Sequence, residues 1–227
     1  MIEGRPLIVT RADPGGTATV ERAKALGLDA RHVPLFAARP VEWTVPADDF
    51  DALLLTSAQA VRLAGAGLGR LAGLPAYAVG AATAAAAKAA GLAVAMIGAH
   101  GAQTLIDAMA SQNIARTLWL CARDRSAFDA RGMTLVALPV YTVDPVEPPA
   151  VWTDAIAAPA VLFAHSARGA RRIADLAGAA RGHLALVAIS AAVAEAAGGG
   201  WAEIAIAGQP DDASMLAAAH DLCQKER

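Results

Sequence analysis

An internal repeat constrains the fold of this 227-residue chain more than any other feature of its sequence. The segment that begins at Tyr77 matches the segment that begins at Val187 without a gap, at a shift of 110 residues. In this match Gly98 falls on Gly208. Self-similarity of this kind indicates two copies of one structural unit.

Each copy also begins with an apolar run that stops at a serine. Leu53–Ser57 falls on Leu162–Ser166, and a segment of helical periodicity follows each serine. Short apolar runs alternate with Ala- and Leu-rich segments along the rest of the chain, which is typical of βα units and a mainly parallel sheet. Each copy has only roughly 60 residues, too few for a complete doubly wound domain.

We therefore expect strands from elsewhere in the chain to complete each copy. Thr117–Leu138 would complete the first copy, and the N-terminal Pro6–Val33 would complete the second. The predicted fold class is α/β, with two doubly wound parallel-sheet domains joined by a two-stranded ribbon hinge and the first domain discontinuous in sequence. The predicted boundaries are 1–36 plus 144–227 for domain 1, 42–138 for domain 2, and 37–41 with 139–143 for the ribbon. Alternatively, the two segments predicted to form the ribbon are ordinary surface loops of a single domain.

The individual elements follow from apolar runs and from helical periodicity. The predicted strands are Leu7–Thr10, Ala30–Pro34, Ala52–Thr56, Ala76–Val79, Val94–Ile97, Leu118–Cys121, Leu135–Leu138, Val161–Ala164, Leu186–Ile189 and Glu203–Ala207. The predicted helices begin near Gly16, Ala58, Ala81, Ala102, Ala150, Ala167, Ala191 and Ala213. Gly65–Gly69 follows a predicted helix and is interpreted as its exit loop.

Composition argues against several classes of partner. Hydrophobic residues make up 56% of the chain, but many are alanines, which favour helices and close packing rather than lipid. We therefore predict no membrane span. The net charge is −2 and there is no basic block, so we expect no nucleic-acid partner. The chain lacks a secretory signal at its start, so we expect a cytoplasmic protein in which Cys121 and Cys223 are free thiols.

Motifs for metals and cofactors are also missing from the sequence. The five histidines are scattered, and none lies at metal-ligand spacing from another ligand residue. No Walker A, GxSxG or GxGxxG motif occurs, and no Cys/His or Ser/His/Asp set is evident. We therefore expect no metal site and no cofactor.

Small or hydroxylic residues follow most of the predicted strands. In parallel α/β sheets, ligands bind outside the carboxyl ends of the strands, and the helix that follows offers unpaired N–H groups and a partial positive charge. This pattern indicates an anion-binding site. The alternative is that the serines only cap their helices. The candidate binding residues are Thr10, Arg11, Thr56, Ser57, Gly80, Thr83, His165, Ser166 and Ser190.

Tyr141 is one of only two tyrosines and lies in the predicted ribbon. Its phenol could donate a proton or a hydrogen bond to a ligand. The alternative is an amphipathic ring that packs over a linker.

Five sequence segments, in order along nearly the whole chain, make it resemble the uroporphyrinogen-III synthase family. They are PLIVTR, FDALLLTSAQAV, YAVGAATAAAAKAAGL, LPVYTVDP and AIAGQPDDASMLAA. The resemblance implies two α/β domains joined by a ribbon. It also implies a reaction in which linear hydroxymethylbilane loses water and closes to uroporphyrinogen III, with the last pyrrole ring inverted and no metal or organic cofactor.

The resemblance also assigns roles to particular residues. Tyr141 matches the linker tyrosine, a candidate to assist loss of the hydroxyl group, and Thr83 matches a threonine of the VGxxT turn. Arg11 and Arg125 are implied as partners of substrate carboxylates. The second copy has Val193 where an equivalent of Thr83 would lie, which fits binding by backbone N–H groups better than binding by two hydroxyls.

The resemblance further implies a monomer that transiently contacts the preceding enzyme of its pathway. The main competing interpretation is a non-catalytic tetrapyrrole- or polyanion-binding sensor module of the same fold. A clamshell metabolite-binding protein and a nucleotide-dependent enzyme are less well supported, because the sequence lacks an export signal and a phosphate-loop glycine pattern.

Overall fold

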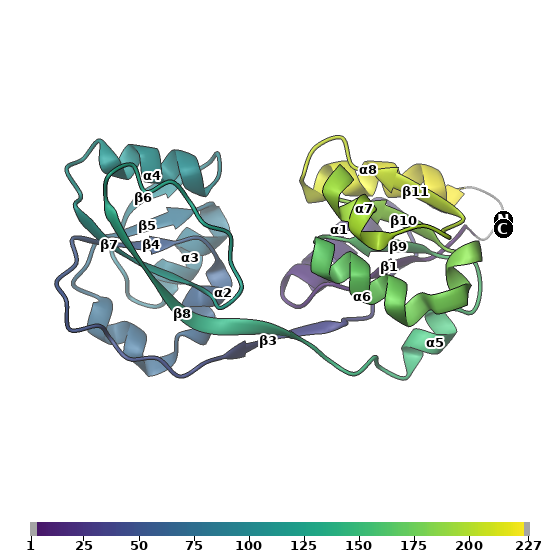
Figure 1. Ribbon diagram of the computed structural model, residues 1–227, viewed down its shortest axis with the longest axis horizontal. Coiled ribbons are helices and arrows are strands. Elements are labelled where there is room, and N and C mark those ends of the chain that lie inside the picture. Colours follow the sequence, from purple (N-terminus) through teal and green to yellow (C-terminus); the bar gives the residue numbers. More distant parts are fainter. Residues whose placement is uncertain (1–3, 225–227) are drawn as a thin grey trace. The chain divides into compact units, whose positions relative to one another are not determined.

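The computed structural model describes residues 4–224, so both ends of predicted domain 1, residues 1–3 and 225–227, lie outside the described residues (Figure 1). Contacts divide the chain into two compact units. Unit 1 combines the residues up to Ala37 with those from Pro145 onward, and unit 2 is Ala38–Asp144. Unit 1 is therefore assembled from both ends of the chain.

Unit 1 contains a five-stranded parallel sheet in the order β11-β10-β9-β1-β2. N-terminal β1 lies between β2 and β9 and pairs with both in parallel, so the N-terminal segment completes the second copy of the repeat. The strands are β1 (Leu7–Val9), β2 (Ala30–His32), β9 (Val161–Ala164), β10 (Ala185–Ala188) and β11 (Glu203–Ile206). The helices are α1 (Gly15–Ala25), α5 (Val151–Ile156), α6 (Ala167–Ala177), α7 (Ala191–Ala197), α8 (Asp212–Gln224) and the 3₁₀-helix η2 (Gly178–His183).

Unit 2 contains a six-stranded sheet in the order β3-β8-β7-β4-β5-β6. Its strands are β3 (Phe36–Pro40), β4 (Ala52–Leu55), β5 (Ala76–Val79), β6 (Val94–Gly98), β7 (Arg116–Ala122) and β8 (Thr134–Pro145). Its helices are α2 (Ala58–Leu63), α3 (Ala81–Ala89), α4 (Ala102–Ala110) and the 3₁₀-helix η1 (Gly65–Leu71). The prediction of an exit loop at Gly65–Gly69 is therefore wrong, because this segment forms the 3₁₀-helix η1.

The two sheets share one topology. The order β6-β5-β4-β7-β8 in unit 2 corresponds to β11-β10-β9-β1-β2 in unit 1. In unit 2 the chain passes from β4 to β5 and β6 on one side and returns as β7 on the other side of β4. In unit 1 it passes from β1 to β2 and, after unit 2, returns as β9 on the other side of β1. The strand order therefore reverses between β4 and β7 and between β9 and β1, and such reversal points are where ligands bind in open α/β sheets.

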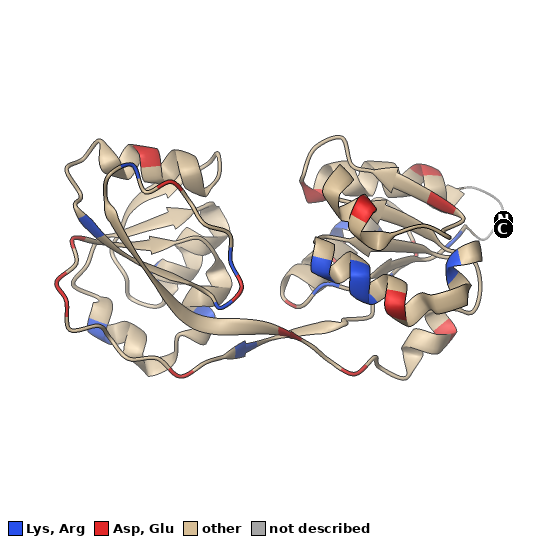
Figure 2. Cartoon of the chain, viewed as in Figure 1, with Lys and Arg blue, Asp and Glu red and all other residues tan. Residues whose placement is uncertain are grey.

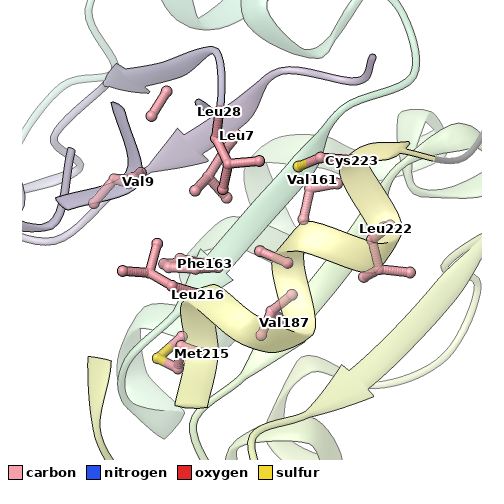
Figure 3. Close-up of a cluster of buried hydrophobic side chains, with 14 of the residues drawn as sticks. Leu7, Val9, Leu28, Val161, Phe163, Val187, Met215, Leu216, Leu222 and Cys223 are labelled. Carbon is pink, nitrogen blue, oxygen red and sulfur yellow. The ribbon is translucent and has the colours of Figure 1, made fainter. Parts of the chain in front are cut away.

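The cores form because the central strands are apolar on both faces. Each residue of β4, β9 and β10 is fully buried, as expected for parallel strands covered by helices on both sides. In unit 1, Phe163 and Val187 of the sheet pack against Met215 and Leu216 of α8 (Figure 3). Burial of each large side chain of this kind stabilises the unit by about 1.5–3 kcal/mol.

The strand predicted at Leu135–Leu138 is longer than expected, because β8 continues to Pro145 and includes the residues assigned to the ribbon. The pairing of β8 with β7 shifts by one residue beyond Pro139, so that Val140 is skipped. Such a bulge accommodates a proline, which has no N–H for the ladder. The main-chain bonds Val41 N–H to Val140 O (3.1 Å) and Val146 N–H to Leu35 O (3.1 Å) make the β3–β8 pair antiparallel.

Charged residues of both signs are interspersed over both units (Figure 2). Helix α6 carries Arg168, Arg171 and Arg172 within its eleven residues. None of the helices within residues 4–224 is both long enough and apolar enough to cross a membrane.

Candidate functional site

The reversal point of the unit 1 sheet brings together the residues that follow β1 and β9. Thr10 and Arg11 follow β1, and His165 and Ser166 follow β9, its neighbour in the sheet. The Thr10 hydroxyl donates to the Phe163 carbonyl at 3.2 Å and Thr10 is buried. Its hydrogen therefore links the two strand ends, and Thr10 supports the site rather than offering a free donor to a ligand.

The two repeat-related serines are N-caps. Ser57 Oγ accepts from the Gln59 N–H at 3.1 Å at the start of α2, and Ser166 Oγ accepts from the Gly169 N–H at 3.0 Å at the start of α6. A cap of this type stabilises a helix by about 1 kcal/mol. Ser190 precedes α7 in the same extended conformation but makes no side-chain cap bond. Capping thus accounts for the two serines without a ligand.

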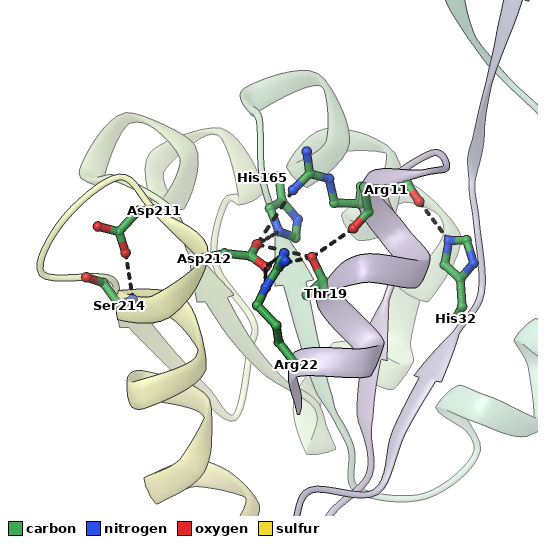
Figure 4. A network of polar contacts seen from close by, with 9 residues as sticks. Arg11, Thr19, Arg22, His32, His165, Asp211, Asp212 and Ser214 are labelled. Carbon is green, nitrogen blue, oxygen red and sulfur yellow. Dashed lines mark hydrogen bonds and ion pairs between the residues drawn. The ribbon is translucent and has the colours of Figure 1, made fainter. Parts of the chain in front are cut away.

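Asp212, the first residue of α8, is the centre of a polar network in unit 1 (Figure 4). Its carboxylate accepts from the Thr19 hydroxyl at 2.8 Å and from Arg22 Nε at 3.0 Å. His165 Nε2 lies 3.2 Å from the carboxylate, and Arg11 Nη1 lies 3.6 Å from it. One carboxylate therefore holds together α1, α8 and the ends of both central strands.

The protonation states of this network follow from its burial and contacts. Burial by itself would raise the pKa of Asp212, but hydrogen bonds from His165, Arg22 and Thr19 outweigh it and lower that pKa below its usual range. Burial lowers the pKa of His165, so its imidazole is neutral at pH 7 and Nε2–H donates to Asp212. The other nitrogen, His165 Nδ1, is buried and has no hydrogen-bond partner among the described residues.

Sequence analysis selected Arg11 and His165 but missed Asp212, Thr19 and Arg22. Asp212 lies within the AIAGQPDDASMLAA segment, where an acidic residue in the first helical turn indicates only a favourable interaction with the helix dipole. Its partners Thr19 and Arg22 are 193 and 190 residues away in the sequence. No local pattern reports such a contact.

In unit 2, Trp119 joins two of the predicted residues. Thr56 follows β4, and its hydroxyl oxygen accepts from Trp119 Nε1 at 3.0 Å. The Arg125 guanidinium lies over the Trp119 ring, with its carbon 5.8 Å from the ring centroid, and Nη1 donates to the Arg123 carbonyl at 2.9 Å. The structure thus gathers Thr56 and Arg125 at the reversal point between β4 and β7.

Gly80 and Thr83 lie at the start of α3, beside β5. Gly80 precedes the helix with φ of 79°, a left-handed conformation that favours glycine. Thr83 is buried, with 5% of its surface exposed. This geometry presents backbone N–H groups at the strand end and encloses most of the threonine side chain.

Tyr141 lies in β8 with 8% of its surface exposed, and its ring packs in the unit 2 core. Its main-chain carbonyl accepts from the Arg123 N–H at 2.8 Å. Within the described part of the chain, no hydrogen bond occupies its hydroxyl. The ring therefore serves as packing, while the hydroxyl is available to another partner.

Comparisons with known proteins agree with this architecture. The family model described as Uroporphyrinogen-III synthase HemD matches residues 17–217. The fold is similar to that of uroporphyrinogen-III synthetase from Helicobacter pylori 26695, at a TM-score of 0.63 and 16% identity over 96% of this chain and 99% of that chain. It is also similar to a mutant uroporphyrinogen III synthase from the extremely thermophilic bacterium Thermus thermophilus, at a TM-score of 0.50 and 20% identity over 97% of this chain and 100% of that chain.

A search of curated protein sequences gives no match. The solved structures show a shared fold, since their identities to this chain are low. The family model, in contrast, covers most of the sequence, including both repeat copies. The chain therefore belongs to the uroporphyrinogen-III synthase family.

Proposed function

We propose that this protein converts hydroxymethylbilane to uroporphyrinogen III, with loss of water and inversion of the last pyrrole ring. The match of the family model to residues 17–217 carries this proposal. The shared fold of the two similar synthases supports it. As a hydro-lyase of this kind, the protein would act on a linear tetrapyrrole with acetate and propionate side chains on every ring.

The proposed chemistry begins at the hydroxymethyl group. The adjacent pyrrole nitrogen donates its electron pair into the ring, the C–O bond breaks, and the hydroxyl group takes up a proton and leaves as water. The last ring then attacks the resulting azafulvene through its substituted carbon and forms a spiro intermediate. The bond from that carbon to the neighbouring methylene breaks, the methylene rebonds to the other side of the ring, and a proton is lost. These steps balance without an oxidant, a reductant or a cofactor.

The protein's main task in this scheme is to select a conformation. Without an enzyme the same azafulvene closes to the un-inverted isomer I, so the catalyst must hold the last ring with its substituted carbon next to the reacting methylene. Positioning and electrostatic stabilisation supply this control.

Carboxylate recognition would use the strand ends described above. Arg11 in unit 1 and Arg125 in unit 2 are the proposed side-chain partners, with backbone N–H groups at the starts of α3 and α6 as further donors. The Thr10 hydroxyl already donates within the fold, and the Ser57 and Ser166 oxygens already accept the cap bonds of α2 and α6. Because capping accounts for both serines, we assign recognition mainly to backbone groups and arginines.

Tyr141 is the proposed donor to the departing hydroxyl group, because its own hydroxyl has no hydrogen-bond partner among residues 4–224. We also propose a cytoplasmic monomer. A transient contact with the enzyme that supplies hydroxymethylbilane would limit spontaneous closure of this substrate.

Product analysis tests the proposal. Freshly generated hydroxymethylbilane is incubated with the protein, the products are oxidised, and uroporphyrins I and III are separated by chromatography. Isomer III that increases in proportion to added protein supports the synthase. Only isomer I, formed at the protein-free rate in the presence of folded protein, refutes it and favours the non-catalytic tetrapyrrole-binding module.

A further inference from the structure

The Arg11 guanidinium differs from the other arginine of the unit 1 network. Arg22 donates to Asp212 from both Nε and Nη2. Arg11 makes only the 3.6 Å ion pair with Asp212, and in the described part of the chain its guanidinium donates no hydrogen bond. Its side chain is 41% exposed. Arg11 is therefore fixed near a carboxylate while its N–H donors stay available to a ligand.

Contacts on three sides fix Arg11. His32 Nε2 donates to the Arg11 main-chain carbonyl at 2.9 Å, and Asp212 attracts the guanidinium. On the third side, the guanidinium lies against Gly15 at the start of α1. A Cβ atom at Gly15 would lie 2.7 Å from Arg11 Nε and 2.8 Å from Cζ and Nη2. Gly15 has an ordinary backbone conformation, so a side chain there would be opposed only by the Arg11 guanidinium beside it.

Asp212 is itself held rigidly enough to orient a second group. Its side chain is only 18% exposed, and Thr19, Arg22 and His165 all contact its carboxylate. Burial lowers the pKa of the Arg11 guanidinium, and the Asp212 carboxylate offsets part of that effect. Two guanidinium groups and one carboxylate leave one positive charge, which suits a single incoming carboxylate.

We propose that Asp212 and Gly15 are positioning residues, which hold the Arg11 guanidinium so that it binds one carboxylate of the linear tetrapyrrole. This inference rests on the proposed function. An arginine fixed in its binding orientation loses less conformational freedom on binding than a mobile one. Release of Arg11 from either contact therefore weakens substrate binding more than it slows the chemical steps.

Two substitutions release Arg11 by different routes. Asp212→Asn keeps the shape of the side chain but removes its charge. Gly15→Ala places a methyl group where the guanidinium lies, and the flexible end of Arg11 moves away. Asp211→Asn is the matched control for the first, because Asp211 accepts from the Ser214 N–H at 2.7 Å at the same helix start. Gly182→Ala controls for the second, because a Cβ there meets open space.

The measurements are KM and kcat for hydroxymethylbilane and, independently of turnover, the Kd of anaerobic uroporphyrinogen III by calorimetry. We expect Asp212→Asn and Gly15→Ala each to raise KM and Kd about tenfold, the loss of roughly one charge-assisted hydrogen bond. Values of kcat should change less than twofold, and both controls should stay within twofold of wild type. Unchanged KM and Kd in the folded variants would overturn the inference.

A double substitution separates positioning from general destabilisation. In an Arg11→Gln background, adding Asp212→Asn should change KM and Kd less than twofold, because the group that Asp212 positions is gone. A further tenfold loss in that background would overturn the inference. Gly15→Ala adds a good helix former, so its melting temperature should not fall, and a loss of affinity cannot be attributed to unfolding.

The binding measurement keeps this inference distinct from the proposed function. If wild-type protein binds uroporphyrinogen III but forms only isomer I, the proposed synthase activity fails and the Kd values of the variants still decide the role of Asp212 and Gly15. If wild-type protein binds no uroporphyrinogen III, the inference is overturned.

Discussion

Arg172 of α6 donates hydrogen bonds to the segments that precede β3 and follow β8 within unit 1. Its removal gives a sharp prediction. From α6, Arg172 Nε donates to the Leu35 carbonyl at 3.2 Å and Nη2 donates to the Val146 carbonyl. These segments also pair directly, through Val146 N–H and Leu35 O at 3.1 Å. One guanidinium thus bridges the segments that precede β3 and follow β8.

The magnitude follows from the two lost bonds. A hydrogen bond from a charged donor contributes about 1.5–3 kcal/mol when buried. Arg172 is only partly buried, and water can replace it at both carbonyls, so we expect Arg172→Ala to cost about 1.5 kcal/mol locally. With that loss, local opening of the pair between Val146 and Leu35 should be about tenfold more populated in the variant than in wild type.

Hydrogen exchange at the Val146 amide measures this opening directly. The amide should exchange about tenfold faster in Arg172→Ala than in wild type, while amides of the unit 2 core strands keep their rates. Arg171→Ala is the control, because Arg171 is exposed on the same helix. Equal exchange rates at Val146 in both variants would refute the view that Arg172 stabilises the pairing of the segments at Leu35 and Val146.

Three further predictions concern the candidate site. Tyr141→Phe should lower kcat by no more than the ~10²–10⁴-fold reach of general acid catalysis, and complete loss of activity in a folded variant would show a larger role. Ser166→Ala should lower the free energy of unfolding by about 1 kcal/mol with little change in KM, whereas Ser166→Pro should raise KM by altering the backbone; equal effects on KM would favour recognition by the hydroxyl. Because His165 has a lowered pKa in the folded state, wild-type stability should fall as pH decreases below about 6.5, and His165→Gln should reduce that slope in urea unfolding between pH 7 and 5; identical slopes would contradict the assigned neutral imidazole.

The sequence predicted the central strands well for a physical reason. Parallel strands covered on both faces must be apolar throughout, so Leu53–Leu55 and Val161–Ala164 stand out as continuous apolar runs. The repeat then indicated which distant segments complete each sheet. Pro139 was misleading, because a proline suggests the end of a strand, while the bulge at Val140 lets β8 continue.

The site was less predictable, because its contacts join residues that are far apart in the sequence. A hydroxyl at a strand end looks the same whether it meets a ligand or a neighbouring carbonyl, and Thr10 proved to bond the Phe163 carbonyl across 153 residues. The role of Asp212 depends on the contacts of its carboxylate with Thr19 and Arg22 of α1, which no local pattern encodes. Nothing in the sequence indicates the role of Gly15, since the space beside it is occupied only when the Arg11 side chain folds back onto it.

The isomer ratio with protein in excess over hydroxymethylbilane tests the central claim most directly, since spontaneous closure then has little time to compete. If the protein selects the inverted closure by positioning the chain, nearly all the product should be isomer III, and the ratio should stay constant from pH 7 to pH 9 while the rate varies. Isomer I in the protein-free proportion would contradict the claim that this protein directs the ring closure.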